Sequence, residues 1–551
     1  MNFEKEIKEI LGRFIKKIPD LEVPPRQELG DYALPCFTIA KELKKSPVNI
    51  AKEFSEKIKP NKIILKTIAV GPYVNFFINK SILAENTLKK ILKEKDKYGI
   101  KKKNKKKIAI DFSSPNIAKP FGVGHLRSTV IGNSIYKIYE SQGYKCIGIN
   151  HLGDWGTQFG KLIVAYKKWG NAKELQKDPI KYLLKLYVKF HDKEDKDLAA
   201  EARHWFNKLE NGDKEALKLW KKFRKLSLVE FKKLYKRLDI SFDSYAGEAY
   251  YNNKLKGVVE LLEEKGLLEE DQGAKVVKLD GMTPALIQKS DGSTLYITRD
   301  LAAVLHRTKT YKPERLLYVV GSEQSLHFMQ LFKIIELLGI KTEAVHVPFG
   351  LFFLPEGKMS TRKGKVVFLE DILNEVASLA EKTINEKNPK LKNKKRVAEE
   401  VGIGAVIFWD LIHDRSRDIV FDKKRVLDFE GETGPYVQYT NARANSILRK
   451  AGKKGKADYS KLAMPVEQKM INLLASYETI LEDAARQYKP SVLAKCLVTV
   501  AQTFNEFYHS CNCLKEEDAG LRNARLELVA ATAQVLKNGL GLLGLKAPKE
   551  M

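Results

Sequence analysis

Hydrophobic positions in the first hundred residues follow a helical spacing and then a strand-like one. Apolar side chains recur at helical intervals between residues 4 and 18, which predicts a helix that ends near Pro19. Between residues 74 and 79, valine, phenylalanine and isoleucine alternate with other side chains at the period of a strand. We therefore predict a small α+β domain over residues 1–100.

The next part of the chain has the pattern of a βαβ unit. After a lysine-rich boundary at residues 101–107, a strand is predicted over residues 108–112. A helix follows from Leu126 and ends at Gly143, a residue suited to the left-handed position after a helix, and a second strand begins at Ile147. Ligands of such units bind at the carboxyl end of the strand, beside the N-terminus of the helix.

The same α/β pattern returns later and then gives way to helices alone. A strand over residues 317–320 and a helix over residues 326–339 complete a Rossmann-like domain, predicted to span residues 108–375. Between its halves, residues from about 161 to 240 are predicted to form a helical insertion. Farther on the strands disappear and the helical spacing continues, which predicts an all-α domain over residues 376–551.

The composition adds one functional indication, an excess of positive charge. The 551 residues include 98 Lys and Arg against 69 Asp and Glu, which gives a formal net charge of +29. Such a surplus favours a polyanionic partner, although a proteome biased toward lysine would produce the same excess. Charge alone therefore leaves nucleic-acid binding and ordinary surface lysines as open alternatives.

Cysteine usage and apolar runs exclude several classes of protein. The five cysteines are scattered and odd in number, which argues against a disulfide framework, and no Cys/His pairs stand at zinc-site spacing. No apolar run approaches the ~18 to 20 residues of a membrane span, and the N-terminus has no hydrophobic signal region. We predict a cytoplasmic protein with reduced thiols, no structural metal and no membrane segment.

The loop between the first strand and helix of the βαβ unit carries a candidate motif. Residues 113–125 read Ser-Ser-Pro-Asn-Ile-Ala-Lys-Pro-Phe-Gly-Val-Gly-His. Pro120 with Gly122 and Gly124 predicts a turn that lets a planar ligand approach the backbone closely. His125 and the helix N-terminus can donate hydrogen bonds to phosphate oxygens. In isolation, such a turn is more often a packing feature than an active site.

A second motif, Lys-Met-Ser-Thr-Arg-Lys-Gly, stands at residues 358–364. A basic loop rich in small hydroxyl side chains suits a pyrophosphate leaving group, because negative charge accumulates there in the transition state. An exposed basic loop without a function would have the same composition.

Together the two motifs resemble the paired signatures of the class I aminoacyl-tRNA synthetases, His-x-Gly-His and Lys-Met-Ser-Lys. The residues around them, and further segments from one end of the chain to the other, are similar to arginyl-tRNA synthetases. These segments are residues 114–119, 150–158, 290–300, 358–364, 431–439 and 539–551. The resemblance implies an α/β fold with a Rossmann-like class I catalytic domain. It also implies that the N-terminal α+β domain binds the tRNA elbow and that the all-α domain binds the anticodon.

The resemblance further implies a reaction and its substrates. Arginyl-tRNA synthetases join L-arginine to tRNA(Arg) through an arginyl-adenylate, with transfer to the 2′-OH of the terminal adenosine. ATP enters with Mg²⁺ as its substrate complex, and members of the family usually need bound tRNA before they activate arginine. A monomer is the default for the family.

The site residues of the family map onto this sequence one by one. For catalysis and ATP binding they are Lys119, Gly122, Gly124, His125, Lys358, Met359, Ser360 and Lys363. For arginine they are Ser114, Asn116, His151, Glu248, Tyr296, Asp300 and Gln324, and for tRNA they are Tyr73, Asn75, Phe77, Tyr439, Arg443, Tyr508 and Met551. A guanidinium has five donors and needs fixed carboxylates and neutral acceptors, which this set supplies. Read singly, Asp300 and Gln324 could be polar residues of first helical turns, and each tRNA residue could be a packing residue.

Two positions depart from the family pattern. Gly122 stands where the family has the first signature histidine, and Thr361 replaces the last lysine of the second signature. The change at Thr361 is common in the eukaryote-like branch of the family. At Gly122 the loss of a transition-state donor could reduce the rate by about 10²–10³-fold unless Lys119 or a water replaces it.

Two other functions remain as alternatives. A different class I synthetase is one, but the sequence has no zinc cluster like that of the cysteine enzyme. It also lacks room for the large editing domain of the leucine, isoleucine and valine enzymes. The other is a tRNA-binding pseudoenzyme, which Gly122 alone suggests and which the complete arginine-binding set argues against.

Overall fold

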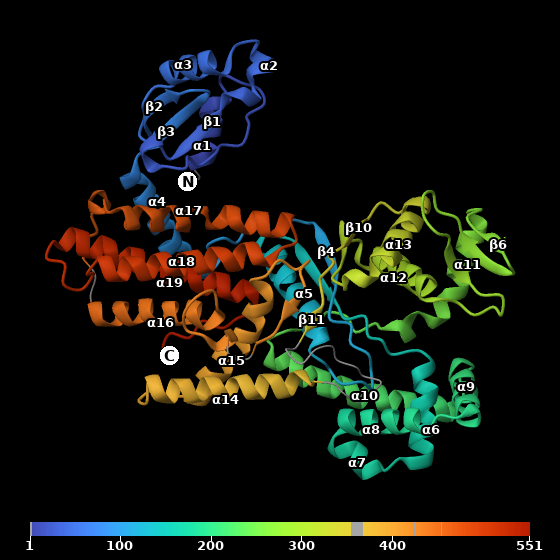
Figure 1. Ribbon diagram of the computed structural model, residues 1–551. Coiled ribbons are helices and arrows are strands. Elements are labelled where there is room, and N and C mark those ends of the chain that lie inside the picture. The colour runs from blue at the N-terminus through green and yellow to red at the C-terminus, as the bar shows by residue number, and fades with distance from the viewer. Residues whose placement is uncertain (1–2, 354–366, 423–424, 453–454) are drawn as a thin grey trace.

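The computed structural model in Figure 1 describes residues 3–353, 367–422, 425–452 and 455–551. Its N-terminal part is an antiparallel sheet with the strand order β1-β3-β2, and α3 packs against β2 and β3. The elements are α1 (Phe3–Leu11), β1 (Tyr32–Pro35), α2 (Ala40–Leu43), α3 (Pro47–Lys57), β2 (Ile64–Val70), β3 (Tyr73–Ile78) and α4 (Lys80–Glu94). The α+β character of this part and the predicted strand are confirmed.

The first predicted helix is wrong at its C-terminal end. α1 ends at Leu11, and from Gly12 onward turns carry the chain through Phe14 and Ile15. Ile15 is nevertheless buried, and the ring of Phe14 lies 5.5 Å from that of Phe54. The apolar spacing beyond α1 therefore reflects burial in turns, because Gly12 weakens the helix at this point.

The central part is a parallel sheet of four strands in the order β10-β9-β4-β5. Helix α5 (Gly124–Ser141) connects β4 (Lys107–Asp111) to β5 (Lys145–Ile149), and α13 (Ser325–Leu337) connects β9 (Arg315–Tyr318) to β10 (Glu343–His346). The predicted strand–helix–strand unit is confirmed, and so are the later predicted strand and helix; β10, which follows that helix, was not predicted. Because β4 pairs with β5 on one side and β9 on the other, the strand order reverses at β4, and sheets of this kind bind ligands at that point.

Two segments separate the halves of the sheet. The first holds α6 (Thr157–Trp169), α7 (Ala172–Lys177), α8 (Pro179–Asp192), α9 (Lys196–Glu210) and α10 (Lys214–Arg237). Asp178, Asp195 and Asp213 each accept a backbone hydrogen bond at the start of α8, α9 and α10, which fixes where these helices begin.

The second segment contains a small antiparallel sheet that the hydrophobic pattern does not predict. It holds α11 (Leu255–Glu264), β6 (Glu269–Asp271), β7 (Ala274–Val277), β8 (Ala285–Gln288) and α12 (Tyr296–Tyr311), with the strand order β6-β7-β8. These strands have three or four residues each, so they are too short to show a period of two.

The C-terminal part is helical, and Figure 1 shows α16 to α19 stacked in layers, with α4 leading from them to the N-terminal sheet. Its helices are α14 (Leu369–Lys387), α15 (Lys394–Leu411), α16 (Gly434–Ala451), α17 (Pro465–Arg486), α18 (Pro490–Ser510) and α19 (Ala519–Leu543). The expectation that strands disappear here is wrong in one detail, because β12 (Ile419–Val420) pairs with β11 (Phe352–Phe353). The boundaries at residues 100, 108 and 376 remain predictions.

Arg127 joins α5 to the segments on either side of the second motif. Its side chain is fully buried, and its Nε donates to a carboxylate oxygen of Asp410 in α15 at 3.1 Å. Nη1 donates to the carbonyl oxygens of Gly350 at 2.7 Å and Arg417 at 2.8 Å, and Nη2 donates to that of Arg415 at 3.3 Å. A buried guanidinium is tolerated because each of its nitrogens has a partner.

Replacing Arg127 by methionine is expected to lower the free energy of unfolding by about 3–5 kcal/mol, because the buried carboxylate of Asp410 and the buried carbonyl group of Gly350 then lose their donor. Urea unfolding followed by circular dichroism measures the change. The control is Arg203→Met, since Arg203 is exposed on α9 and its loss should change stability by less than about 0.5 kcal/mol. A loss below about 1 kcal/mol for the Arg127 variant would show that the buried network is not stabilising.

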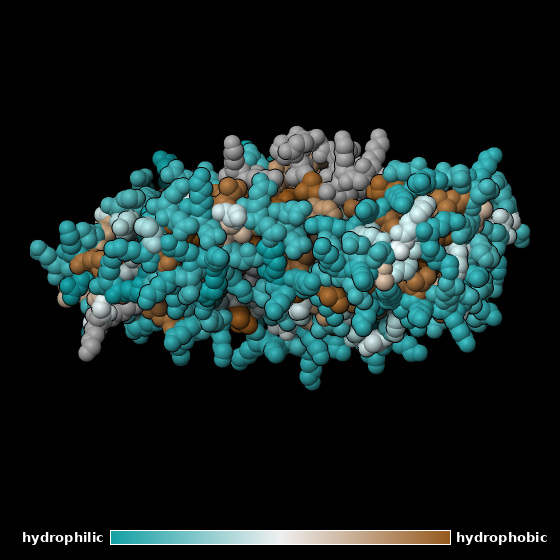
Figure 2. Space-filling view, turned by 90° about the horizontal axis from the view of Figure 1, so that it is seen from below, coloured by the Kyte–Doolittle hydropathy of each residue, from teal (hydrophilic) through white to brown (hydrophobic). Residues whose placement is uncertain are grey.

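The surface agrees with the charged composition. The face shown in Figure 2 is mostly hydrophilic, and its hydrophobic side chains lie in small, separate groups. Within the described ranges, no helix has both the length and the apolar character needed to cross a bilayer.

Candidate active site

A cavity opens at the carboxyl edge of the parallel sheet, where the strand order reverses. Asp111 and Tyr318 are the last residues of β4 and β9, and they are paired in register. Both line a cavity of about 470 Å³. A cavity of this size, formed by loops that follow parallel strands, is typical of a small-molecule site.

The structure brings together all seven residues predicted to contact arginine. Ser114, Asn116, His151, Glu248, Tyr296, Asp300 and Gln324 all line this cavity. They come from the loops after β4 and β5, from the start of the 3₁₀ helix η4 (Glu248–Lys254), from the first turns of α12 and from the 3₁₀ helix η5 (Ser322–Gln324). Residues far apart in the sequence meet here because loops that follow parallel strands end at the same edge of the sheet.

Asp300 is held between two histidines. Nε2 of His327 lies 2.7 Å from one carboxylate oxygen, and Nε2 of His151 lies 3.9 Å from the other. Burial by itself raises the pKa of Asp300, but the hydrogen bond of His327 and the positive charges nearby hold this pKa below its ordinary value. Asp300 is therefore ionised at neutral pH and presents a fixed negative charge to the cavity.

Glu248, the second carboxyl group of the cavity, differs in its protonation. Burial raises the pKa of Glu248 to about 7; Arg299 opposes the rise, and the negative charges of Asp154 and Asp300 add to it. The side chain is therefore close to half protonated at neutral pH. A cation placed beside Glu248 would favour its ionised form.

Arg307, which the sequence does not identify as a site residue, sets the protonation of His151. It is buried on α12, and its Nη2 lies 2.8 Å from a carboxylate oxygen of Asp111 and 3.2 Å from Nδ1 of His151. Because Arg307 can only donate, Nδ1 accepts, so His151 carries its proton on Nε2, which faces Asp300. Burial also lowers the pKa of His151, so the ring is neutral.

Three ionisable residues that line the cavity beside Tyr318 are absent from the sequence-based set. They are Asp111, Arg299 and His327. Asp111 lies near the carboxyl end of the strand predicted over residues 108–112, so the rule that ligands bind at the carboxyl end of strands could have found it. Arg299 and His327 give no such signal, because single polar residues on amphipathic helices are usually surface residues.

The loop after β4 holds its residues in an unusual backbone conformation. Ser113, Ser114 and Ala118 have positive φ angles of 75°, 45° and 61°. Such angles cost about 1–3 kcal/mol each and persist only where surrounding contacts fix them. The backbone N–H of Ser113 donates to the hydroxyl of Ser128 at 2.8 Å. That of Ala118 donates to the hydroxyl of Ser227 at 3.1 Å. The loop is therefore preorganised.

His125 stands at the N-terminus of α5 as a neutral hydrogen-bond donor. The backbone N–H of Gly122 donates to its Nδ1 at 3.2 Å, so the proton of the ring is on Nε2. Burial lowers the pKa of His125 to about 4, and the positive charge of Lys119 contributes to this decrease. A Cβ at Gly124 would have no atom within 4 Å, so the backbone beside His125 is open to a ligand.

The second motif, with Lys358, Met359, Ser360 and Lys363, lies outside the described residues. The segment after it is attached to the first motif. The backbone N–H of Leu369 donates to the carbonyl oxygen of Phe121 at 3.0 Å, and Phe368 forms an antiparallel bridge with Gly122. The chain that leaves the second motif is thus anchored on the turn of the first.

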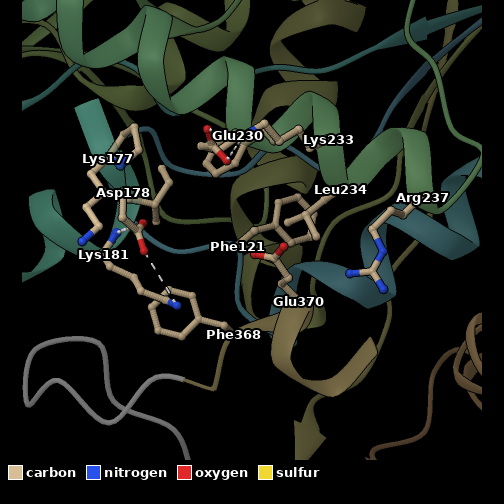
Figure 3. Close-up of a pocket in the computed structure, with 13 residues that line it drawn as sticks. Phe121, Lys177, Asp178, Lys181, Glu230, Lys233, Leu234, Arg237, Phe368 and Glu370 are labelled. Atoms are coloured by element: carbon tan, nitrogen blue, oxygen red, sulfur yellow. Dashed lines mark hydrogen bonds and ion pairs between the residues drawn. The ribbon is translucent and has the colours of Figure 1, made fainter. Parts of the chain in front are cut away.

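A second cavity, of about 210 Å³, lies beside this junction (Figure 3). Phe121 and Phe368 line it, together with charged residues of α8 and α10. Figure 3 shows Lys181 between Asp178, its partner at 3.8 Å, and the ring of Phe368, whose centroid lies 5.6 Å from Nζ. Since the ring of Phe121 also lies 5.3 Å from that of His125, this cavity borders the first motif from the side of the helical insertion.

The three tRNA-contact residues predicted in the N-terminal domain share one face of its sheet. Tyr73, Asn75 and Phe77 alternate along β3, with Asn75 buried and the two rings half-buried. The ring of Phe37 lies edge-on to Tyr73 at 5.8 Å, and Nζ of Lys66 lies 4.4 Å from the centroid of Phe77. Aromatic rings beside a lysine suit contact with nucleic acid.

The other residues predicted to contact tRNA meet in the helical domain. The guanidinium carbon of Arg443 lies 4.9 Å from the ring centroid of Tyr439 and 5.1 Å from that of Tyr508. Met551 and Phe429 both pack against a small hydrophobic core formed mainly by residues of α14 and α15. The ring of Phe429 lies 6.3 Å from that of Tyr439. The four predicted residues therefore belong to one region of the surface.

The described part of the chain contains no group of three or more His, Cys, Asp or Glu residues that could hold a metal ion. All five cysteines are buried and unpaired.

Three family models match the chain in sequence order. The one described as arginyl tRNA synthetase N terminal domain matches residues 1–78. The class I (R) tRNA synthetase catalytic domain matches residues 87–423, and the DALR anticodon binding domain matches residues 437–551.

Known proteins with these domains are similar along the whole chain. The arginine–tRNA ligase of Clostridioides difficile is 52% identical over 540 residues, which are 96% of this chain and 95% of that protein. The arginine–tRNA ligase of Clostridium botulinum is 50% identical over 555 residues, which are 99% of this chain and 98% of that protein. The solved structure of the Thermus thermophilus arginyl-tRNA synthetase has a TM-score of 0.88 at 25% identity and covers 100% of this chain and 99% of its own.

Proposed function

The chain belongs to the arginyl-tRNA synthetase family and is an arginine–tRNA ligase, and from this premise we propose which residues bind each substrate. The pseudoenzyme alternative finds no support among relatives at about 50% identity. The observation that carries the proposal is the meeting of all seven candidate arginine residues in one cavity at the reversal point of the sheet.

In this proposal the guanidinium group of arginine binds between the carboxylates of Asp300 and Glu248. Tyr296 covers its plane, and Gln324 supplies a neutral acceptor; both line the same cavity as the two acids. Citrulline and ornithine are rejected because they leave buried carboxylate oxygens without a donor.

The α-amino and carboxylate groups of arginine bind at the other residues of the cavity, Ser114, Asn116 and His151. Ser114 belongs to the preorganised loop, and its hydroxyl donates to Asp111 at 3.0 Å. Fixed polar groups at this end hold the reacting carboxylate in one orientation, which is how synthetases of this class gain rate without a covalent enzyme intermediate.

ATP, with Mg²⁺ as its substrate complex, binds at the open backbone of Gly124. Its phosphates receive hydrogen bonds from Nε2 of His125 and from the N-terminus of α5, and Lys119, Lys358, Ser360 and Lys363 add contacts. A carboxylate oxygen of arginine attacks the α-phosphorus, the bond to the bridging oxygen breaks, and pyrophosphate leaves. The 2′-OH of the terminal adenosine then attacks the carbonyl carbon of the adenylate, loses its proton, and displaces AMP.

We further propose that tRNA(Arg) spans both outer domains. Its elbow meets the face of β3 that carries Tyr73 and Phe77, and its anticodon bases stack in the region of Tyr439, Arg443 and Tyr508. The proposal takes the enzyme to be a cytoplasmic monomer that needs bound tRNA before it activates arginine.

The test is arginine-dependent charging of tRNA, measured beside ATP–pyrophosphate exchange with and without tRNA. Robust charging, with exchange only in the presence of tRNA, supports the proposal and shows that Gly122 is compensated. Exchange at the full rate without tRNA would reject the proposed tRNA requirement.

Arginine affinity is expected to fall as the pH decreases through about 7. The raised pKa of Glu248 means that the group is protonated below this pH, and it must lose that proton to pair with a guanidinium. Binding at pH 7 should therefore release a proton, which calorimetry in two buffers of different ionisation enthalpy detects. The Glu248→Gln variant, which cannot titrate, should show no such release. An affinity that stays constant between pH 6 and 8 contradicts the assignment.

Substitution of Tyr508 by alanine is expected to raise the KM for tRNA about tenfold or more, because one stacked base contributes ~1–3 kcal/mol. The KM for arginine should stay within about twofold, since Tyr508 lies in α18, outside the residues that line the arginine cavity. Steady-state charging measures both constants. The Tyr508→Phe variant keeps the ring and serves as the control. An equal loss in both variants would show that stacking is not the role of this residue.

A further inference from the structure

Asp154 is fully buried next to the segment that carries Glu248, and its two carboxylate oxygens have separate partners. Oδ1 accepts a hydrogen bond from the backbone N–H of Ala249 at 2.9 Å. Oδ2 accepts one from Nε of Arg224 at 2.6 Å. Since Ala249 directly follows Glu248, one side of this carboxylate holds the backbone of the arginine site and the other holds the helical insertion.

Helix α10 of the insertion supplies two more contacts to the same place. Nε1 of Trp220 donates to the carbonyl oxygen of Asp154 at 2.7 Å. Nη2 of Arg224 donates to the carbonyl oxygen of Tyr245 at 3.1 Å. Residues 245–249 are therefore held at one end by Arg224 and at the other end by Asp154, which accepts from Ala249. Trp220 and Arg224 are four residues apart, so they project from the same face of α10.

The Glu248 segment has no free space on the side of Asp154. A Cβ at Gly247 would lie 2.5 Å from the carbonyl oxygen of Leu152 and 2.6 Å from Oδ1 of Asp154. The backbone N–H of Glu248 also donates to the carbonyl oxygen of Leu152, at 3.0 Å. Any shift of Asp154 is therefore transmitted to Glu248.

We propose that Asp154, clamped by Arg224 and Trp220 of α10, is a positioning residue that fixes Glu248 in the arginine site. The inference rests on the proposed role of Glu248 as a guanidinium ligand. Asp154 does not contact arginine itself and acts only through Glu248. Because α10 holds Asp154 in place, the helical insertion influences how well arginine binds. A misplacement of ~1 Å in such a supporting contact can reduce activity by about 10²-fold.

The matched pair of variants is Arg224→Gln and Arg237→Gln. Both arginines belong to α10, both donate from Nε to a carboxylate, and their side chains are similarly exposed, at 29% and 23%. Arg237 pairs with Glu399 instead of Asp154. In charging assays with tRNA, Arg224→Gln should raise the KM for arginine about tenfold, because the variant loses the charge-assisted hydrogen bond to Asp154. Its kcat and its KM for ATP should stay within about twofold of the wild-type values. Arg237→Gln should leave all three constants unchanged, and Arg224→Lys should restore part of the arginine affinity.

Glu248→Gln in the same series separates this inference from the proposed function. If it leaves the KM for arginine unchanged, the proposed role of Glu248 is rejected. If it raises this KM while Arg224→Gln behaves like Arg237→Gln, only the positioning role is overturned. If a folded Arg224→Gln variant raises the KM for ATP as much as the KM for arginine, the effect is not specific to the Glu248 segment, and the positioning role is also overturned. Should that variant fail to fold, Gly247→Ala keeps every polar group and should give the same selective rise in the KM for arginine.

Discussion

An Asp300→Asn variant is expected to charge tRNA with a kcat/KM for arginine that is lower by about 10²–10³-fold. The amide has the shape of the carboxylate but lacks the charge that faces the guanidinium. Removing one partner of a buried, hydrogen-bonded charge pair costs about 2–5 kcal/mol, and each 1.4 kcal/mol is a factor of ten. His327 and the positive charges nearby keep the pKa of Asp300 low, so Asp300 itself stays ionised from about pH 6 to 8.

Steady-state kinetics with arginine and ATP varied separately measures this loss. Asp271, on the exposed strand β6, provides the control, since its conversion to asparagine removes a carboxylate that does not line the cavity. The KM for ATP should change less than about twofold in both variants, because Asp300 contacts no phosphate in the proposed complex. A reduction below tenfold for Asp300→Asn would exclude this carboxylate from the guanidinium site.

The sequence could predict in part that the candidate arginine residues meet, because topology places some of them. Ser114 and His151 follow predicted strands, and parallel strands bring the loops at their carboxyl ends to one edge of the sheet. The assignment of all seven residues to arginine came from the family resemblance, which also supplied Glu248, Tyr296, Asp300 and Gln324, residues that no predicted strand places at this edge. The structure places these residues on the same cavity through short 3₁₀ helices and a helix N-terminus, elements that hydrophobic periodicity does not reveal.

The residues that hold the site in place could not be predicted in this way. Arg307 pairs with Asp111, and Arg224 pairs with Asp154 across 70 residues of sequence. A basic residue on an amphipathic helix looks like a surface charge until the fold shows a buried carboxylate beside it. Such pairs depend on tertiary contacts between separate segments, so neither composition nor spacing identifies them.

The first motif keeps the orientation of His125 although one family histidine is missing. The sequence lacks the family histidine at Gly122, which suggested a weakened site. In the structure the backbone N–H of Gly122 fixes the tautomer of His125, a role that needs no side chain at position 122. The remaining histidine, His125, is therefore oriented as a donor. Most of what the side chains of this motif contribute to the reaction rate should depend on it.

His125→Asn is accordingly expected to lower kcat in ATP–pyrophosphate exchange by about 10²–10³-fold, the usual effect of removing one preorganised transition-state donor. The KM for arginine should stay within about twofold, because His125 is not among the residues that line the arginine cavity. The control is His204→Asn, since His204 is exposed on α9 and its loss should not affect exchange.

The pH dependence of the wild-type reaction tests the same role independently. Burial lowers the pKa of His125 to about 4, so the ring is neutral above that pH and gains its proton only as the pH falls toward 4. Its Nε2–H is a donor in the neutral form, and kcat should therefore show no titration of this histidine between pH 6 and 8. A kcat that increases as the pH falls through about 6.5, and that loses this dependence in His125→Asn, would mean that the cationic imidazolium is the active form. In that case the charge of His125, rather than its fixed tautomer, would stabilise the departing pyrophosphate.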